Sequence, residues 1–347
     1  MNSEIAIFLI EDGILTGAIY ALLALASVLV FATTRVILVP QGEFVTFGAL
    51  TLASLQLGAV PGIIYLLACL AAVVTVIEVV DLFRNGRLRR LPVVLLLYAV
   101  APALIIAATV YFGPRQPSVF VQVLLTIALV TPLGPFLYRI AFQPIANAST
   151  RLLFVVAIAA HFILQGSGLL FFGAEGFRVT PIVETSVSIG GFELKSQAVL
   201  ILATAMVFTM LLYALFEFTM IGKALRATAV NRLGARIVGI SSPMVGAISF
   251  GIAALMGAVS GILVAGLTTI YYDSGFIIGL KAFVGAICGN MISYPLAIVG
   301  ALAVGTIESF GAYWSSAYKD AIVFAILVPV LVWLSLHSTT HEEEEDT

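Results

Sequence analysis

Long apolar runs separated by short polar breaks fill almost the whole chain. A helix of about 20 mostly apolar residues crosses the hydrocarbon core of a membrane, which is about 30 Å thick. The pattern predicts about eleven such segments, at residues 13–34, 43–58, 62–81, 91–112, 118–139, 151–172, 196–219, 243–267, 276–289, 294–312 and 319–336. We therefore expect an all-α, polytopic transmembrane bundle of about 10–11 segments. One domain would cover residues 1–336, followed by a disordered acidic tail at 337–347.

Two of these segments, 43–58 and 276–289, are short for a full crossing. The second is rich in Gly and carries Lys281, so it is either a re-entrant or broken helix or a short span. Small residues four apart allow helix backbones to approach closely in lipid. We therefore expect helix–helix contacts within the bundle at the pairs Gly257/Gly261, Gly275/Gly279 and Gly285/Gly289.

The composition supports a membrane protein, since hydrophobic residues make up 61% of the chain and charged residues 10%. Cys69 and Cys288 lie inside apolar runs and are expected to be small buried residues without a disulfide. Acidic residues and no basic ones precede the first apolar run, so no cleavable signal peptide is expected.

Basic residues in the loops predict the orientation, because cytoplasmic loops of membrane proteins are enriched in Lys and Arg. With the N-terminus outside, eleven basic residues fall on one side, four on the other, and Lys281 within a segment. We therefore expect an external N-terminus and a cytoplasmic C-terminus. The external stretch 173–195 is long enough for a small hairpin, or it is a solvated connector.

A polar island at residues 222–240 interrupts the apolar pattern. It carries Lys223, Arg226, Arg232 and Arg236 and no acid, in an Ala-rich background that favours a short helix. Such a helix between two spans is either an inert connector or a docking element for a cytoplasmic partner. The predicted topology places it in the cytoplasm.

Signals of enzymatic chemistry are absent from the sequence, which has no phosphate-binding Gly-x-x-x-x-Gly-Lys-Ser/Thr loop. We expect a protein that is not an enzyme and that binds no cofactor, metal or nucleic acid itself. His161 could titrate in a proton pathway, although a lone His in a span is more often a packing residue. Lys281 needs a partner or a water-filled cavity, and Asp273 and Glu308 are candidate partners.

A permease driven by a separate energy-supplying protein explains these features best. A self-contained secondary transporter would need intramembrane acids or a His relay, and a channel would leave the basic island unexplained. A diverged, non-transporting membrane partner is a third alternative.

Several motifs match a known family, at residues 17–26, 40–44 (Pro-Gln-Gly-Glu-Phe), 48–49, 138–144, 151–153, 222–240, 279–283, 295 and 318–320. In these stretches the chain resembles the LivH-type permeases of branched-chain amino acid ABC importers, and also the related urea-importer permeases. The chain departs from the family pattern at Leu38–Pro40, where Asn-Phe-Ala is usual. Three expected glycines are replaced by Asn290, Ile292 and Leu296. Region 82–117 contains about two extra segments relative to the family.

The resemblance implies a multi-pass permease subunit of the plasma membrane. Its partners would be cytoplasmic ATPases that carry ATP and Mg, a second related permease or another copy, and an external solute-binding protein. The cargo would be a branched-chain or related apolar amino acid, or alternatively urea or a short amide. The residues implied in coupling to the ATPase are Gly222, Lys223, Arg226, Ala227, Asn231, Arg232, Ala235, Arg236 and Gly239. Those implied in a translocation pathway are Gln41, Gly42, Glu43, Gly279, Lys281 and Phe283.

Overall fold

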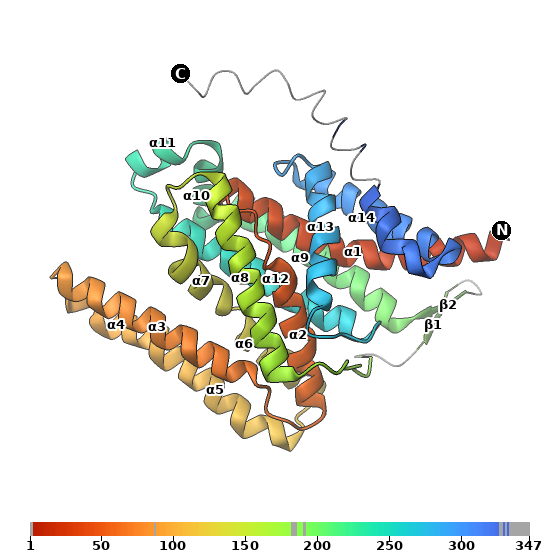
Figure 1. The fold of residues 1–347 in the computed structure, drawn as a ribbon, viewed down its shortest axis with the longest axis horizontal. Coiled ribbons are helices and arrows are strands. Elements are labelled where there is room, and N and C mark those ends of the chain that lie inside the picture. The colour runs from red at the N-terminus through yellow and green to blue at the C-terminus, as the bar shows by residue number, and fades with distance from the viewer. Residues whose placement is uncertain are drawn as a thin grey trace.

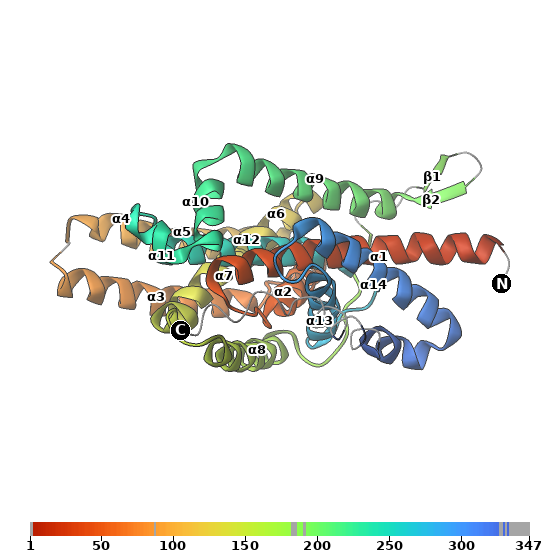
Figure 2. The same cartoon turned by 90° about the horizontal axis from the view of Figure 1, so that it is seen from above.

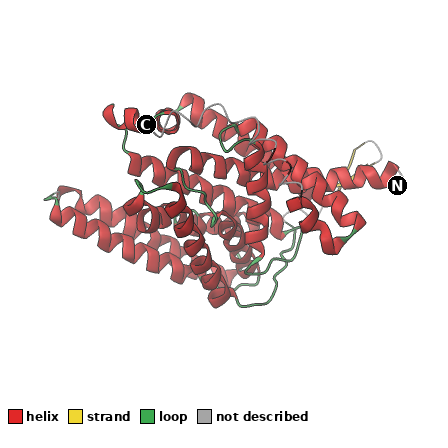
Figure 3. Ribbon diagram, turned by 45° about the horizontal axis from the view of Figure 1, so that its top comes forward, coloured by secondary structure: helices red, strands yellow, loops and turns green. Residues whose placement is uncertain are grey.

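The computed structural model describes residues 3–86, 88–181, 186–189, 192–325, 329 and 332, and helices dominate this part of the chain (Figure 3). The helices are α1 Ser3–Thr34, α2 Gln41–Gln56, α3 Ile63–Arg84, α4 Leu91–Leu95, α5 Ala101–Phe112, α6 Val119–Val130, α7 Leu133–Leu137, α8 Thr150–Phe172, α9 Ser196–Phe218, α10 Met220–Val230, α11 Arg232–Ile237, α12 Ser242–Ala265, α13 Ser274–Cys288 and α14 Tyr294–Trp314. Strands β1 Ser186–Ile189 and β2 Phe192–Lys195 form an antiparallel hairpin.

Eight helical runs among the described residues are long and apolar enough to cross a membrane. Turns of π-helix join α4 to α5, and α7 to the residues after it, so that residues 91–115 and 119–145 each form one continuous run. With the shorter α2 and α13, these runs match the first ten predicted segments in order. Of the eleventh segment, 319–336, residues 319–325, 329 and 332 are described and are helical, and the acidic tail lies outside the described residues. The predicted polytopic helical bundle is confirmed.

Helices α1 and α12 lie at the centre of the bundle, with α14 packed along α1 and α2 against α12. Figure 2 shows α9 on one side of these central helices and α8 on the other. A Cβ added to Gly257 or Gly261 would overlap α2, and one added to Gly285 would overlap α14. The contacts predicted from the Gly spacing are confirmed, and they hold the central helices at close approach.

The first helix is longer than predicted, because α1 extends to Ser3 instead of beginning at residue 13. The acidic residues before residue 13 look like flanking sequence, yet the Oγ of Ser309 donates a hydrogen bond to Asp12 Oδ2 over 3.1 Å. Because Asp12 is bound by a residue of α14, α1 continues through this position. This contact could not be predicted from local sequence.

Residues 82–117 contain the end of α3, a turn and one helical run, 91–115. Two extra segments in this part of the chain would therefore have to include α3 itself. Figure 1 shows α3, α4 and α5 as a hairpin whose tip projects beyond the rest of the bundle. The stretch 173–195 ends in the β1–β2 hairpin, one of its two predicted alternatives, and is therefore more than a solvated connector.

The turn between α13 and α14 contains two non-glycine residues with positive φ, Asn290 at 50° and Met291 at 54°. Asn290 stands where the family resemblance predicts Gly. Because L-residues other than Gly pay about 1–2 kcal/mol for this conformation, and Asn pays less, stability should follow the order Gly, Asn, Ala at position 290. Thermal unfolding midpoints of the Asn290→Gly and Asn290→Ala proteins in detergent would measure this order. An Ala variant as stable as the Gly variant would contradict the strained turn.

Candidate functional site

The polar island at 222–240 folds as two helices, which corrects the single short helix that the sequence predicts. Asn231 separates α10 from α11 in an extended conformation, and its Oδ1 accepts a hydrogen bond from the Gly234 N–H over 2.8 Å. Thr219 caps the start of α10 in the same way through the Gly222 N–H, at 3.0 Å. Gly239 then ends the element with a φ of 88°. Side-chain caps of this kind set the helix boundaries.

Two basic residues of α11 bind the connector that precedes α8. Arg232 Nη1 donates to the Ala146 carbonyl over 3.0 Å, and Arg236 Nη2 donates to Asn147 Oδ1 over 3.3 Å. Burial lowers the pKa of the Arg232 guanidinium from its ordinary value. Two of the motif regions, the connector and the polar island, are therefore joined in space. Replacing Arg232 with an acidic residue would disturb this packing as well as any contact with a partner.

The two basic residues of α10 differ in their surroundings. Arg226 Nη1 lies 3.0 Å from Glu217 Oε2 at the end of α9, while Lys223 is exposed. Three of the four basic side chains of the island are thus engaged within the chain. Among the four basic residues, Lys223 is therefore the one most available to bind an acceptor on a partner.

Besides basic side chains, α10 and α11 expose a group of apolar ones. The side chains of Val230, Leu233, Ile237 and Val238 are between 68% and 88% exposed, while Ala235 on the opposite face of α11 is buried. We call these four residues the apolar face. They lie outside the membrane-spanning helices, and exposed apolar patches in such positions mark protein contacts.

A second candidate site lies at the start of α2, in the middle of the bundle. The chain leaves α1 at Thr34 and runs without helix through residues 35–40 before α2 begins. Gln41 Nε2 donates to the carbonyl of Ala253, which is halfway along the 24-residue α12, over 3.0 Å. The short second segment is therefore a half-span that begins at mid-depth. Non-helical backbone at this depth occurs where it is buried in protein or lines a cavity.

Glu43, in the first turn of α2, meets His161 from the middle of α8. The Glu43 Oε1 and His161 Nδ1 atoms are 3.0 Å apart, and the two side chains are 0% and 4% exposed. His161 is therefore not the lone packing residue that the sequence indicates, since it faces a buried acid. Only the tertiary structure brings these two residues together.

Helix α13 separates two cavities, because its opposite faces carry different side chains. On one face, Phe276, Gly279 and Phe283 line a groove of about 490 Å³ together with α8 and residues 37–39. On the other face, Lys281 lines a cavity of about 520 Å³ bounded by α1, α12 and α14. The predicted pathway residues thus do not form one surface. Gly279 and Phe283 lie on the groove, and Lys281 lies on the cavity behind it.

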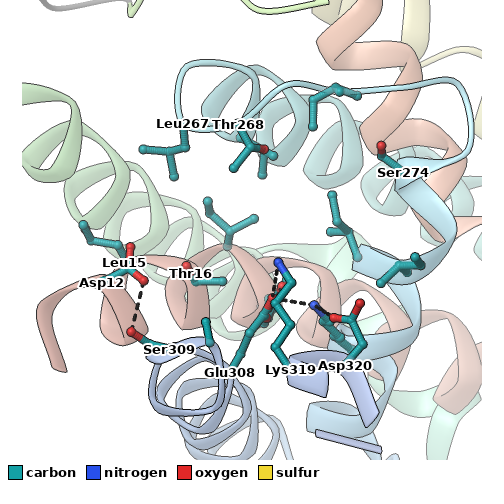
Figure 4. Close-up of a pocket in the computed structure, with 18 of the residues that line it drawn as sticks. Asp12, Leu15, Thr16, Leu267, Thr268, Ser274, Glu308, Ser309, Lys319 and Asp320 are labelled. Atoms are coloured by element: carbon teal, nitrogen blue, oxygen red, sulfur yellow. Dashed lines mark hydrogen bonds and ion pairs between the residues drawn. The ribbon is translucent and has the colours of Figure 1, made fainter. Parts of the chain in front are cut away.

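Buried Lys281 is held by two carboxylates of its cavity, Glu308 and Asp320, which are both labelled in Figure 4. Its Nζ lies 2.5 Å from Glu308 Oε1 and 2.7 Å from Asp320 Oδ1. The hydroxyl of Tyr20 donates to the second oxygen of Glu308 over 2.6 Å. Glu308 is thus confirmed as a partner. The second partner is Asp320 and not the predicted candidate Asp273.

Gly42 explains why α2 and α13 lie so close together. A Cβ at this position would overlap the backbone of Gly275, and a Cβ at Gly279 would lie 2.9 Å from Gly42. Of the residues predicted to line a pathway, Gln41, Gly42 and Glu43 are buried behind the groove. Their role in the structure is to place α2 against α12, α13 and α8.

The comparisons with known proteins decide the family. A family model described as the branched-chain amino acid transport system permease component matches residues 9–331. The chain belongs to this family.

Among described residues, no group of three or more His, Cys, Asp or Glu side chains could hold a metal.

Curated relatives agree with this assignment. The high-affinity branched-chain amino acid transport system permease protein LivH of Salmonella typhimurium is 31% identical over 217 residues, 59% of this chain and 69% of the relative. LivH of Escherichia coli strain K12 gives the same values. BraD of Pseudomonas aeruginosa, a permease protein of the same kind of system, is 26% identical over 216 residues, 60% of this chain and 70% of the relative. No solved structure matches the chain.

Proposed function

We propose that this permease is the membrane-spanning subunit of an ATP-driven, binding-protein-dependent importer of the plasma membrane. Its cargo would be a branched-chain or related apolar amino acid. ATP and Mg would be bound by cytoplasmic ATPase subunits, and a second permease or another copy would complete the membrane part. An external binding protein would deliver the cargo. The N-terminus would lie outside and the C-terminus inside the cell, in agreement with the distribution of Lys and Arg.

The apolar face of α10–α11 is the observation that carries this proposal. Its four side chains are exposed outside the spans, where contact with water is unfavourable. An ATPase that covers them would remove that cost on binding. The element is also anchored to the α8 connector by Arg232 and Arg236, so a displacement of the apolar face would be transmitted to α8. Both properties suit a helix that couples ATP hydrolysis to the membrane part.

The double substitution Leu233→Ser and Ile237→Ser is therefore expected to abolish stimulated ATP hydrolysis by the assembled importer. Both side chains are more than two-thirds exposed, so the permease itself should insert and fold normally. The measurement is ATP hydrolysis by the complex purified through a tag on this chain, with and without loaded binding protein. Phe83→Ser, which changes a similarly exposed apolar side chain near the end of α3, serves as the matched surface control. Full stimulation in the double Ser variant would exclude the apolar face as the coupling contact.

One observation favours a second candidate, a proton-coupled secondary transporter. The buried Glu43–His161 pair is an intramembrane acid with a titratable partner, as such a transporter requires. Uptake by intact cells separates the two functions. We expect uptake of labelled leucine to stop when ATP is depleted and to persist when an uncoupler collapses the proton gradient under conditions that maintain ATP. The opposite result would support proton coupling.

A further inference from the structure

The groove between α8 and α13, which we call the α8–α13 groove, has the size of a small-molecule site. Its volume of about 490 Å³ lies within the range of about 300–1,000 Å³ usual for ligand pockets. Phe276, Gly279 and Phe283 share one face of α13 at helical spacing and form one wall. Phe162 and Gln165 of α8 lie on the opposite wall. Most of this lining is apolar, so the groove suits an aliphatic side chain.

His161 and Gln165 are the polar side chains of this lining, and His161 is the ionisable one. Its Nδ1 faces Glu43, which is fully buried on the other side of the ring. An ionised carboxylate only accepts hydrogen bonds, so an ionised Glu43 holds the proton on Nδ1. The Nε2 atom then remains for a ligand. When the imidazole is protonated, Glu43 balances its charge and Nε2–H becomes a donor to an anion.

We propose that the α8–α13 groove binds the cargo, with its carboxylate at His161 Nε2 and its aliphatic side chain against Phe276 and Phe283. This assignment rests on the proposed import of apolar amino acids and names the groups that recognise them. A free α-carboxylate would be required for binding. Urea and short amides lack both the charge and the apolar side chain, so the groove would select against them.

The Lys281 cavity is unsuited to the same role. Its lysine is already bound by Glu308 and Asp320, and Asp12 adds a third carboxylate. Three acids there face two lysines, Lys281 and Lys319. A ligand carboxylate would meet an excess of negative charge in that cavity. In the α8–α13 groove, by contrast, Glu43 is shielded by the His161 ring.

Protection of a cysteine placed in the groove tests the proposal. Leu280→Cys, at another position of the groove lining, would be introduced into the full-length permease with Cys69→Ser and Cys288→Ala, and the labelling rate by a water-soluble thiol reagent would be measured in nanodiscs. We expect leucine at millimolar concentration to slow labelling several-fold. Isoamylamine, which lacks the carboxylate, should have no effect. Thr269→Cys in the Lys281 cavity is the control, and leucine should not change its labelling.

His161→Gln should remove the protection by leucine, because Gln has no imidazole Nε2 to donate to the cargo carboxylate. Equal protection by leucine and isoamylamine in the Leu280→Cys protein would overturn the carboxylate site, and that comparison does not depend on the His161 variant. Absence of labelling without ligand, as when lipid fills the groove, would also overturn it. If leucine protects the groove but no ATP-driven uptake exists, the importer proposal fails and the binding site stands. If ATP-driven uptake occurs but leucine does not protect the groove, the binding site fails and the importer proposal stands.

Discussion

Gly42→Val is expected to prevent the accumulation of folded permease. A Cβ at position 42 would overlap the carbonyl group of Gly275, and neither backbone can move without separating α2 from α13. Overpacking of a filled core typically costs about 1–3 kcal/mol, and a clash with a backbone that cannot move is expected at or above the upper end of that range. Because α2 also carries Glu43 and Gln41, its displacement would remove the contacts to α8 and α12. The amount of monodisperse protein after detergent extraction measures this effect.

Gly166→Val is the matched control for this change. Gly166 lies within α8, and a Cβ at this position would meet no atom within 4 Å. The same side chain in a helix should therefore leave extraction and the thermal unfolding midpoint nearly unchanged. If both variants lost the folded protein equally, the effect would come from the substitution itself, and the account of the α2–α13 contact would be wrong.

Lys281→Met is expected to destabilise the permease by about 3–5 kcal/mol, the range typical of breaking a buried ion pair. The change leaves Glu308 and Asp320 facing each other without the buried cation that holds them. Tyr20 still donates to Glu308, and the partly exposed Lys319 lies 3.9 Å from Glu308 Oε1, but neither contact replaces the buried cation. The measurement is the shift in the thermal unfolding midpoint in detergent.

A triple variant separates the charge effect from the loss of side-chain volume. Lys281→Met combined with Glu308→Gln and Asp320→Asn removes all three charges and keeps similar shapes. Its unfolding midpoint should recover most of the loss, since neutral groups cost less to bury than unpaired charges. A triple variant as unstable as Lys281→Met would show that the ion pairs contribute little.

The positions and order of the first ten predicted segments follow from sequence, because apolar length decides whether a helix can cross a membrane. The helix contacts at Gly257 and Gly261 were predictable for a similar reason, since the small side chains must face a neighbour. Glu308 was also a sound candidate partner for Lys281, since a buried cation in a span requires an anion nearby. Each of these predictions depends on a local pattern or on one strong energetic requirement.

The parts that could not be predicted depend on tertiary structure. Asn231 divides the polar island because its side chain caps α11, while the Ala-rich composition favours one continuous helix. Arg232 binds a carbonyl in a connector that is distant in sequence. The shortness of the segment at 43–58 indicated an incomplete span, but its start at mid-depth appears only from the contact between Gln41 and α12.

ATP-driven uptake into proteoliposomes tests the central claim most directly. The complex purified in mild detergent through a tag on this chain would be reconstituted, with ATP and Mg enclosed on the side that carries α10–α11 and leucine-loaded binding protein added on the other. We predict that labelled leucine accumulates only when ATP is hydrolysed, and that a protonophore has no effect. Uptake that needs no ATP and ceases with the protonophore, or a complex that contains no ATPase, would contradict the account.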